Sequence, residues 1–190
     1  MRLPSPRSAL ALLLVASLAR AQEIERTPDP LGKLDPSTRY AIEMLMDSAR
    51  LAGLPYGPLE SKALEGISKR ASGREIFTAV RRVFRSLKEA RVVLGAGAAS
   101  DELAAAAGAL RVGVTSAQLS RIATTRDGRP LTVPLVVLAD LVTRGVPRDT
   151  ASLTIFQLSL RGAADDDFLG LWRSVERDIV SGTDPGVALL

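Results

Sequence analysis

The stretch that decides the fold is SGREIFTAVRRVFRSLKEARVVLG, residues 72–95. Four apolar residues recur in it at the spacing of one helix face: Ile76, Val80, Val83 and Leu87. This period predicts an amphipathic helix over 73–94. Ser72 and Glu75 match a capping box, in which each side chain bonds a backbone N–H of the helix start. Gly95 is suited to the other end, because glycine enters the left-handed conformation at little cost.

The same helical pattern continues on both sides of this stretch, from Ser37 onward. It predicts eight helices, over residues 37–52, 57–70, 73–94, 100–112, 116–127, 131–144, 148–161 and 165–181. Most of them end at or near a glycine, and few runs alternate with the period of two that a strand requires. Thr115 and Gln118 match a second capping box, and Pro147 suits a first helical position. The sequence therefore predicts an all-α domain over 37–190.

A weak internal repeat begins at three glycines that each follow a predicted helix: Gly53, Gly113 and Gly145. A base stands sixteen residues after each glycine: Lys69, Arg129 and Arg161. An apolar residue stands twenty-three residues after each: Ile76, Val136 and Phe168. Thirty residues on, the match fails at Thr143. Two architectures stay open, a stack of helical hairpins similar to an α-solenoid and an irregular helical bundle.

The first residues have the pattern of a secretory signal peptide. Arg2 and Arg7 precede an apolar run over 9–18, and Ala19-Arg20-Ala21 matches the small-residue cleavage site. The run is shorter than the roughly 20 apolar residues that span a bilayer. We expect cleavage of residues 1–21 and export to the periplasm or the extracellular space, with no transmembrane span in the mature chain. An uncleaved N-terminal anchor is the alternative.

The composition limits the chemistry that the mature chain can perform. Residues 22–36 contain three prolines and are expected to form a flexible linker. Without the signal peptide, 22 bases and 21 acids remain, a net charge of +1 that gives no reason to expect nucleic-acid binding. Arginine outnumbers lysine by 21 to 4, which suits a GC-rich bacterial genome. The chain has neither cysteine nor histidine, so it lacks disulfides, thiol nucleophiles and the commonest general base.

Two stretches resemble functional sites, a metal site and a dinucleotide-binding turn. Asp165, Asp166 and Asp167 suggest a metal site, but adjacent helical side chains point about 100° apart, and carboxylates are favoured in a first helical turn. The apolar face expected behind them consists of Phe168, Leu171, Trp172, Val175 and Ile179, which places Trp172 in the core. Residues 92–103, VVLGAGAASDEL, imitate a dinucleotide-binding turn but lack its third glycine. We expect a helix end there and a new helix capped by Ser100.

Paired carboxylates are the remaining candidates for catalysis. Glu43 with Asp47, and Glu60 with Glu65, lie within one or two turns of each other on predicted helices. Two carboxylates suffice for glycoside hydrolysis if one of them is held protonated. An exported hydrolase is therefore an alternative function, although we assign no catalytic residue, no metal ligand and no cofactor.

One surface is predicted to bind a partner. Residues 69–91 contain eight bases and two acids, and four of the bases fall opposite the apolar stripe of the 73–94 helix: Arg74, Arg81, Arg85 and Lys88. Residues 163–190 have the opposite balance, two bases and six acids. The basic side chains predict contact with an acidic protein, an anionic envelope surface or the acidic end of another copy. A solvated face is the alternative. The function expected is that of a non-enzymatic, exported binding or scaffold protein.

Overall fold

The computed structural model describes residues 29–125 and 128–189. The chain divides into two compact units, residues 1–33 and residues 34–190. Residues 29–33, the described part of the first unit, form a turn in which the Gly32 N–H donates to the Asp29 carbonyl at 3.0 Å. The predicted signal peptide and its cleavage site lie outside the described residues. Residues 22–28 of the predicted linker also lie outside them.

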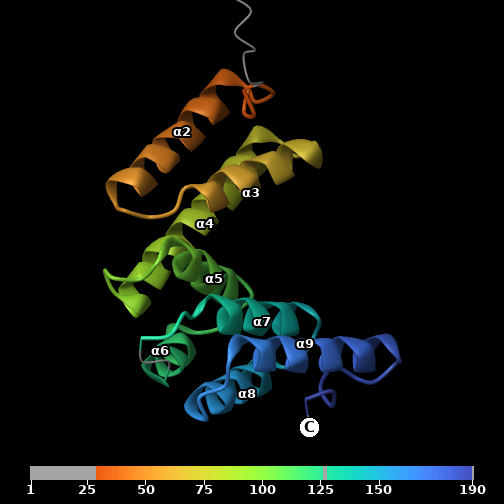
Figure 1. The fold of residues 1–190 in the computed structure, drawn as a ribbon. Coiled ribbons are helices and arrows are strands. Elements are labelled where there is room, and N and C mark those ends of the chain that lie inside the picture. Colours follow the sequence, from red (N-terminus) through yellow and green to blue (C-terminus); the bar gives the residue numbers. More distant parts are fainter. Residues whose placement is uncertain (1–28, 126–127, 190) are drawn as a thin grey trace, which may run out of the picture. The chain divides into compact units, whose positions relative to one another are not determined.

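The second unit is all-α in the ranges that the structure describes (Figure 1). Its helices are α2 (Pro36–Leu51), α3 (Gly57–Ser68), α4 (Gly73–Leu94), α5 (Ser100–Arg111), α6 (Ser116–Thr125), α7 (Thr132–Thr143), α8 (Arg148–Leu160) and α9 (Asp165–Val180). Every described helix begins and ends within two residues of its predicted boundary. The predicted fold class is therefore confirmed.

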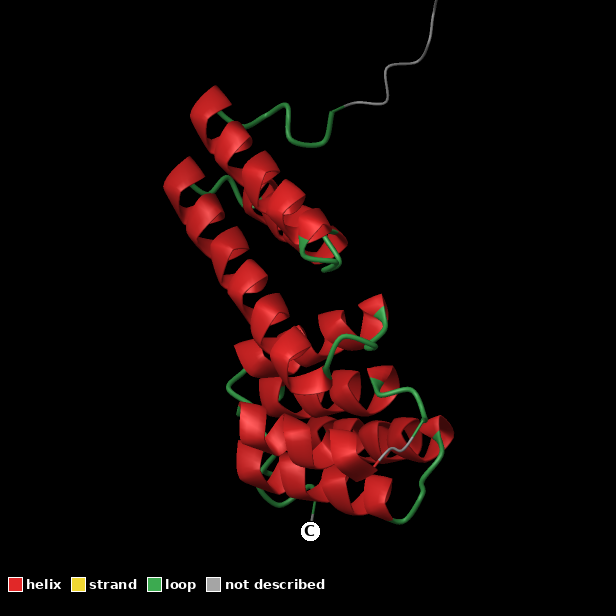
Figure 2. Ribbon diagram, turned by 90° about the vertical axis from the view of Figure 1, so that its left-hand side faces the viewer, coloured by secondary structure: helices red, strands yellow, loops and turns green. Residues whose placement is uncertain are grey.

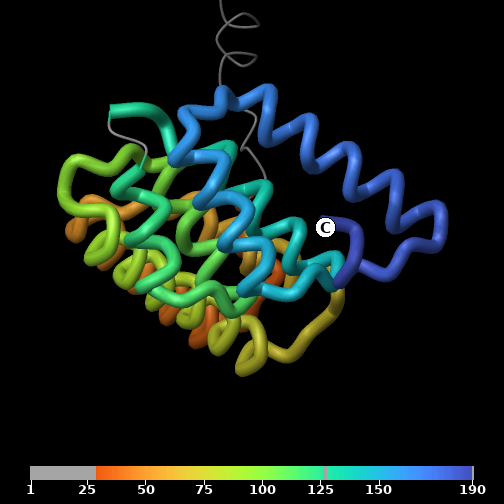
Figure 3. Tube along the Cα trace, turned by 90° about the horizontal axis from the view of Figure 1, so that it is seen from below, coloured from red at the N-terminus to blue at the C-terminus, as the bar shows by residue number. Residues whose placement is uncertain are grey.

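Most helices of this unit lie in two rows, and within a row each helix packs on the next but one along the chain. In one row α2 contacts α4, α4 contacts α6, and α6 contacts α8. In the other row α5 contacts α7, and α7 contacts α9, as Figures 1 and 2 show from two sides. The rows are joined where α3 and α5 pack on α4 and where α7 packs on α8. Among consecutive described helices only α3–α4, α4–α5 and α7–α8 pack extensively, so the rows are not a regular stack of hairpins. Figure 3 shows the two rows from the end formed by α8 and α9.

Helix α4 is the centre of the core, since it contacts α2, α3, α5 and α6. Its buried residues are Ile76, Val80, Val83, Leu87 and Ala90. The predicted capping box is present: the Glu75 N–H donates to Ser72 Oγ at 3.4 Å, and the Ser72 N–H donates to Glu75 Oε2 at 2.8 Å. The Ser72 hydroxyl and N–H together lower the pKa of Glu75. The carboxylate that closes the helix start is thus held in its charged form.

The three repeated glycines end their helices in the same way. Each has a positive φ, and the N–H of the next residue bonds back to a carbonyl five residues earlier. These bonds run from Leu54 to Ala49 at 2.8 Å, from Val114 to Ala109 at 3.1 Å, and from Val146 to Leu141 at 3.0 Å. All six of these apolar residues are buried, so each turn is a Schellman motif with its hydrophobic contact. The repeated turn is confirmed.

The repeat does not extend into the second helix of each unit. Ile76 and Phe168 are buried at the position twenty-three residues after the glycine, but the equivalent Val136 is 52% exposed. α4 is 22 residues long and α7 only 12, so the two helices present different faces to their neighbours. The turn chemistry recurs because it is local, whereas the register of each helix depends on what packs against it.

Arginines from distant parts of the chain bind the carbonyl of the glycine at three helix ends. Among the described residues these bonds join Arg91 Nη2 to Gly53 O at 2.6 Å, Arg148 Nη1 to Gly113 O at 3.2 Å, and Arg129 Nη1 to Gly162 O at 2.7 Å. Helix C-termini carry partial negative charge and unsatisfied carbonyls, both of which favour a cation. These bonds connect turns that are 33 to 38 residues apart in the chain.

Two predicted capping roles are one residue off, although the helices themselves begin at the predicted residues. α5 is preceded by Ala99 as its N-cap, not by Ser100, and Glu102 accepts the Ala99 N–H at 2.9 Å. Pro147 is the N-cap of α8 and not its first helical residue. In the first case only the acidic half of a capping box is present, because alanine has no side-chain acceptor.

The prediction that Trp172 belongs to the core is wrong. α9 is the last described helix and packs mainly on α7, so only part of its apolar face is covered. Phe168 and Val175 are buried, but Leu171, Trp172 and Ile179 are only half-buried. The indole N–H of Trp172 donates to Asp140 Oδ2 of α7 at 2.6 Å. Trp172 therefore lies at the edge of the α7–α9 contact with its polar atom bonded.

Arg70, at the end of α3, leads to a stability prediction. It is the one non-glycine residue with positive φ in the described ranges, at 54°, and the following Ala71 N–H makes the same back-bond to Gly66. Arg70→Gly should raise the free energy of unfolding by about 0.5–1 kcal/mol, because the left-handed conformation strains an L-residue. The melting temperature should rise by about 1–4 °C.

Gly182→Ala is the matched control. Gly182 has a φ of 98° and no atom within 4 Å of an added Cβ, so the change introduces only backbone strain. It should lower the free energy of unfolding by about 1 kcal/mol. A fall in melting temperature for Arg70→Gly would contradict the assignment of strain to Arg70.

Candidate functional site: the basic face of α4

The four predicted partner-binding residues lie on the solvent side of α4. Arg74, Arg81, Arg85 and Lys88 are all exposed, and we call them the basic face. Successive residues of a helix turn by about 100°, which places these four within a narrow arc opposite the buried stripe. The burial of that stripe therefore decides which way the basic face points. The predicted orientation of the helix is confirmed, and the binding role stays a prediction.

Two phenylalanines support the basic face from one side. Phe77 and Phe84 are half-buried. The Arg81 guanidinium lies 5.7 Å from the centre of the Phe77 ring, and the Lys88 ammonium lies 5.9 Å from that of Phe84. Each pair is spaced four residues apart, and a cation over an aromatic ring gains about 0.5–1 kcal/mol at an exposed site. These contacts hold two of the four cations close to the helix surface.

The structure adds two arginines that the sequence pattern did not single out. One groove of about 340 Å³ is lined by Arg74, Glu75, Thr78, Ala79 and Arg82. Another of about 330 Å³ is lined by Arg82, Arg85, Ser86, Glu89 and Arg111. Arg82 lines both grooves, and Arg111 comes from α5. The Arg81-Arg82 doublet could have indicated the first of them, whereas Arg111 is placed only by the packing of α5 on α4.

The basic side chains of this region are not engaged in ion pairs with described residues, although Glu75 and Glu89 lie beside them. In the described part of the chain, no ion pair is formed by the basic face, by Arg82 or by Arg111. The nearby Glu75 is engaged in its capping box, and Glu89 accepts a hydrogen bond from the Ser116 hydroxyl. Uncompensated charge of one sign raises the local concentration of oppositely charged groups.

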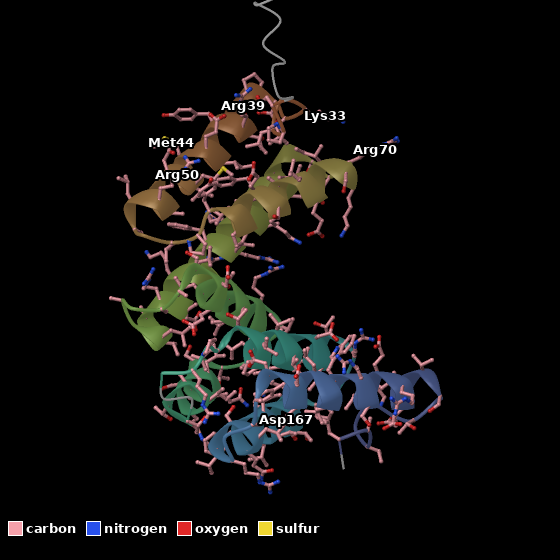
Figure 4. All side chains as sticks on the ribbon, in the orientation of Figure 1. Lys33, Arg39, Met44, Arg50, Arg70 and Asp167 are labelled. Atoms are coloured by element: carbon pink, nitrogen blue, oxygen red, sulfur yellow. The ribbon has the colours of Figure 1, made fainter. Side chains whose placement is uncertain are left out.

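The three consecutive aspartates lie in the first turn of α9, as predicted. Asp167, labelled in Figure 4, accepts the Ala164 N–H at 2.8 Å and so completes the helix start. In the described residues, no three acidic side chains gather in an arrangement suited to a metal ion. The glycine-rich stretch over 92–103 is likewise the end of α4, a turn at Gly95 with a φ of 85°, and the start of α5.

Three of the four carboxylates considered for catalysis form ion pairs with bases. Glu43 binds Arg39 at 2.7 Å and Asp47 binds Arg50 at 2.6 Å; both arginines are labelled along α2 in Figure 4. Glu65 binds Lys62 at 2.7 Å and Lys69 at 2.6 Å. The two lysines lower the pKa of Glu65 to about 2. A general acid in glycoside hydrolysis requires a raised pKa, so the environment of Glu65 is the opposite of what that role needs.

A polar cluster joins α7 to α9 beside the half-buried Trp172. Asp140 accepts hydrogen bonds from Arg144 Nε at 2.5 Å and from the Trp172 indole at 2.6 Å, and Arg144 also pairs with Glu176 at 3.1 Å. Burial opposes ionisation of Asp140, but the bonds from Arg144 and Trp172 outweigh it and lower the pKa. Asp140 raises the pKa of Arg144 in turn. These polar contacts connect α9 to α7.

Comparisons with known proteins were negative: no family model, no curated protein and no solved structure matches this chain. None of the helices in the described ranges is both long enough and apolar enough to cross a bilayer.

The polar cluster around Trp172 predicts how much the ring and the indole N–H of Trp172 each contribute to stability. Trp172→Phe should lower the free energy of unfolding by about 1 kcal/mol, because Asp140 loses one donor. Trp172→Ala should cost less than the roughly 3–5 kcal/mol typical of a fully buried aromatic ring. Chemical denaturation of both variants would measure these differences. A loss of the full core value for Trp172→Ala would contradict the half-buried position of the ring.

The carboxylates with lowered pKa predict how the stability of the fold falls at low pH, which we call the acid limb of the stability profile. Glu65 has a pKa of about 2 in place of 4.5, and hydrogen bonds from Ser37 and Thr38 lower that of Asp35 from 3.8 to about 2. Such groups stabilise the fold fully above their unfolded pKa values and lose this contribution as the pH falls toward their folded values. The melting temperature should therefore fall as the pH is lowered from about 4.5 to about 2.

From about pH 5.5 to about pH 8 the melting temperature should stay nearly constant, since the chain has no histidine. Glu65→Gln should make the acid limb shallower, because the substitution removes one of the titrating groups. A steep change in melting temperature between about pH 6 and about pH 7 would contradict this profile.

Proposed function

We propose that this chain is a non-enzymatic, exported binding or scaffold protein that holds an acidic partner protein against the basic face of α4. The observation that carries the proposal is a set of exposed cations, without ion pairs to described residues, on the helix that forms the centre of the core. Because the core immobilises α4, its cations are presented at constant spacing. Preorganised groups lose less conformational freedom on binding than mobile ones do.

The flanking grooves favour an acidic protein segment over a lipid surface. A flat layer of anionic headgroups reaches mainly the most exposed side chains of a helix, Arg81 and Arg85 among them. An acidic segment can also place carboxylates in the groove where Arg82, Arg85 and Arg111 meet. Guanidinium groups bind carboxylates through two parallel hydrogen bonds, which adds geometric specificity to the charge attraction.

The aromatic contacts also favour this partner. A helix that lies in a membrane interface needs a broad apolar face directed at the lipid. The apolar stripe of α4 is buried in the core, and Phe77 and Phe84 are partly covered by Arg81 and Lys88. The surface around the basic face therefore suits electrostatic docking better than insertion.

The hydrolase alternative has less support. Three of its four candidate acids, Glu43, Asp47 and Glu65, are paired with bases, and the pKa of Glu65 is lowered, which favours the charged form that a general acid must avoid.

The basic face can be tested with a charge-matched pair of variants. One combines Arg81→Gln, Arg85→Gln and Lys88→Gln; the control combines Arg161→Gln, Arg173→Gln and Arg177→Gln, three exposed bases in or after α8 and α9. Both remove three positive charges. Only the first should reduce retention on immobilised polyglutamate at low salt, and its remaining binding should depend less on salt.

The melting temperature of the first variant should be unchanged or slightly higher. Its residues repel one another at a cost of about 0.2–0.5 kcal/mol per pair at i, i+4 spacing. Equal retention of both variants would make the basic face only a solvated surface. Retention of the wild type on vesicles of anionic phospholipid, but not on polyglutamate, would replace the protein partner by a membrane surface. Pull-down from the envelope of the native cell would then identify the partner.

A further inference from the structure

A pocket of about 320 Å³ lies between α6 and α8, away from the basic face. It is lined by Gln118 and Arg121 of α6 and by Asp149, Ser152, Leu153 and Phe156 of α8. This volume is at the lower end of the range of about 300–1,000 Å³ that small-molecule sites occupy. The lining combines a cation, an anion and an apolar surface, so its chemistry can be matched to a ligand.

Arg121 supplies the positive charge of the pocket. Its guanidinium lies 4.7 Å from the centre of the Phe156 ring, so the aromatic face holds the group in place. Arg121 makes no ion pair or side-chain hydrogen bond with any other described residue. A stacked guanidinium keeps its N–H edges free, and these edges match a carboxylate.

Asp149 supplies the negative charge and is oriented by two neighbours. Its Oδ1 accepts the Gln118 side-chain N–H at 2.9 Å and forms an ion pair with Arg148 Nε at 3.3 Å. Arg148 is itself bonded to the Gly113 carbonyl at 3.2 Å. In the described part of the chain, no donor occupies Asp149 Oδ2. This second oxygen is available to an ammonium group.

The lining of the pocket also includes two apolar side chains, Leu153 and Phe156. Leu153 is 49% exposed, although it lies on a helix beside the half-buried Phe156 ring. Ser152 is 6% exposed, and its buried hydroxyl has no hydrogen-bond partner among the described residues. The pocket thus offers an apolar surface to a side chain and contains one polar group that is not yet satisfied.

We infer that this pocket binds a small zwitterion, a free α-amino acid with an apolar side chain. Its carboxylate pairs with Arg121, its ammonium group pairs with Asp149, and its side chain lies on Leu153 and Phe156. Arg121 and Asp149 line one pocket without pairing with each other, and each is held by a different neighbour. A ligand that carries both charges satisfies both groups at once. This inference stands independently of the function proposed for the basic face.

Leucine and two analogues that each lack one charge provide the first test. N-acetyl-leucine keeps the carboxylate and loses the ammonium group, and leucine amide keeps the ammonium group and loses the carboxylate. Titrations followed by NMR, with ligand up to about 10 mM, should show saturable binding of leucine with shifts in α6 and α8. Each analogue should bind at least about tenfold more weakly.

Two variants assign the charges. Asp149→Asn should weaken leucine binding at least about tenfold and leave N-acetyl-leucine binding unchanged, since that analogue has no ammonium group. Arg121→Gln should weaken leucine binding similarly and leave leucine amide unaffected. Asp166→Asn and Arg173→Gln, which change exposed residues of α9, are the matched controls and should bind leucine as the wild type does. Unchanged melting temperatures of the variants would confirm that the fold is intact.

Several outcomes would overturn the inference. Absence of saturable leucine binding with wild-type protein would remove the site. Equal affinity for leucine and N-acetyl-leucine would make it a plain anion site, and equal affinity for leucine and leucine amide would make it a plain cation site. Equal losses in the control variants would show that the change in net charge, and not the pocket, is responsible.

Discussion

The burial of the apolar stripe of α4 is the interaction on which the rest of the second unit depends. Each fully buried valine, leucine or isoleucine contributes roughly 1.5–3 kcal/mol, and α4 buries four such residues against four neighbouring helices. Repulsion between the cations on its other side costs only a few tenths of a kcal/mol per pair. The stripe therefore decides the orientation of α4, and the exposure of the basic face is its consequence.

The turns between helices follow a second constraint, the need to satisfy the last carbonyls of every helix. The chain has no disulfide to fasten its turns, and the Schellman motif with a buried apolar pair recurs at the ends of α2, α5 and α7. Arginines then bind the exposed glycine carbonyls at the ends of α2, α5 and α8. Three of the described arginines are structural in this sense, whereas the bases on the solvent side of α4, which form no ion pair with described residues, remain available to a partner.

The two proposed binding surfaces share one physical feature. At the basic face and at the pocket between α6 and α8, charged groups are held by stacking on aromatic rings or by hydrogen bonds and keep unpaired atoms, although Asp149 also forms an ion pair with Arg148. Elsewhere in the described residues, charges such as those of Glu65 and Asp140 are satisfied by ion pairs within the fold. Unsatisfied but oriented charges are the groups that gain most from an external partner.

The sequence by itself determined the helices and their ends, because helical periodicity, capping residues and glycine turns act within a few residues of each other. It also determined which side of α4 carries the basic face, since that face is opposite a long apolar stripe. Only the tertiary structure decided that Trp172 is half-buried, because the burial of α9 depends on how many helices pack against it. Arg111 beside Arg82, and Arg121 beside Asp149, are likewise products of packing. Residues that are 28 or more positions apart meet only when two helices become neighbours, and no local pattern encodes that choice.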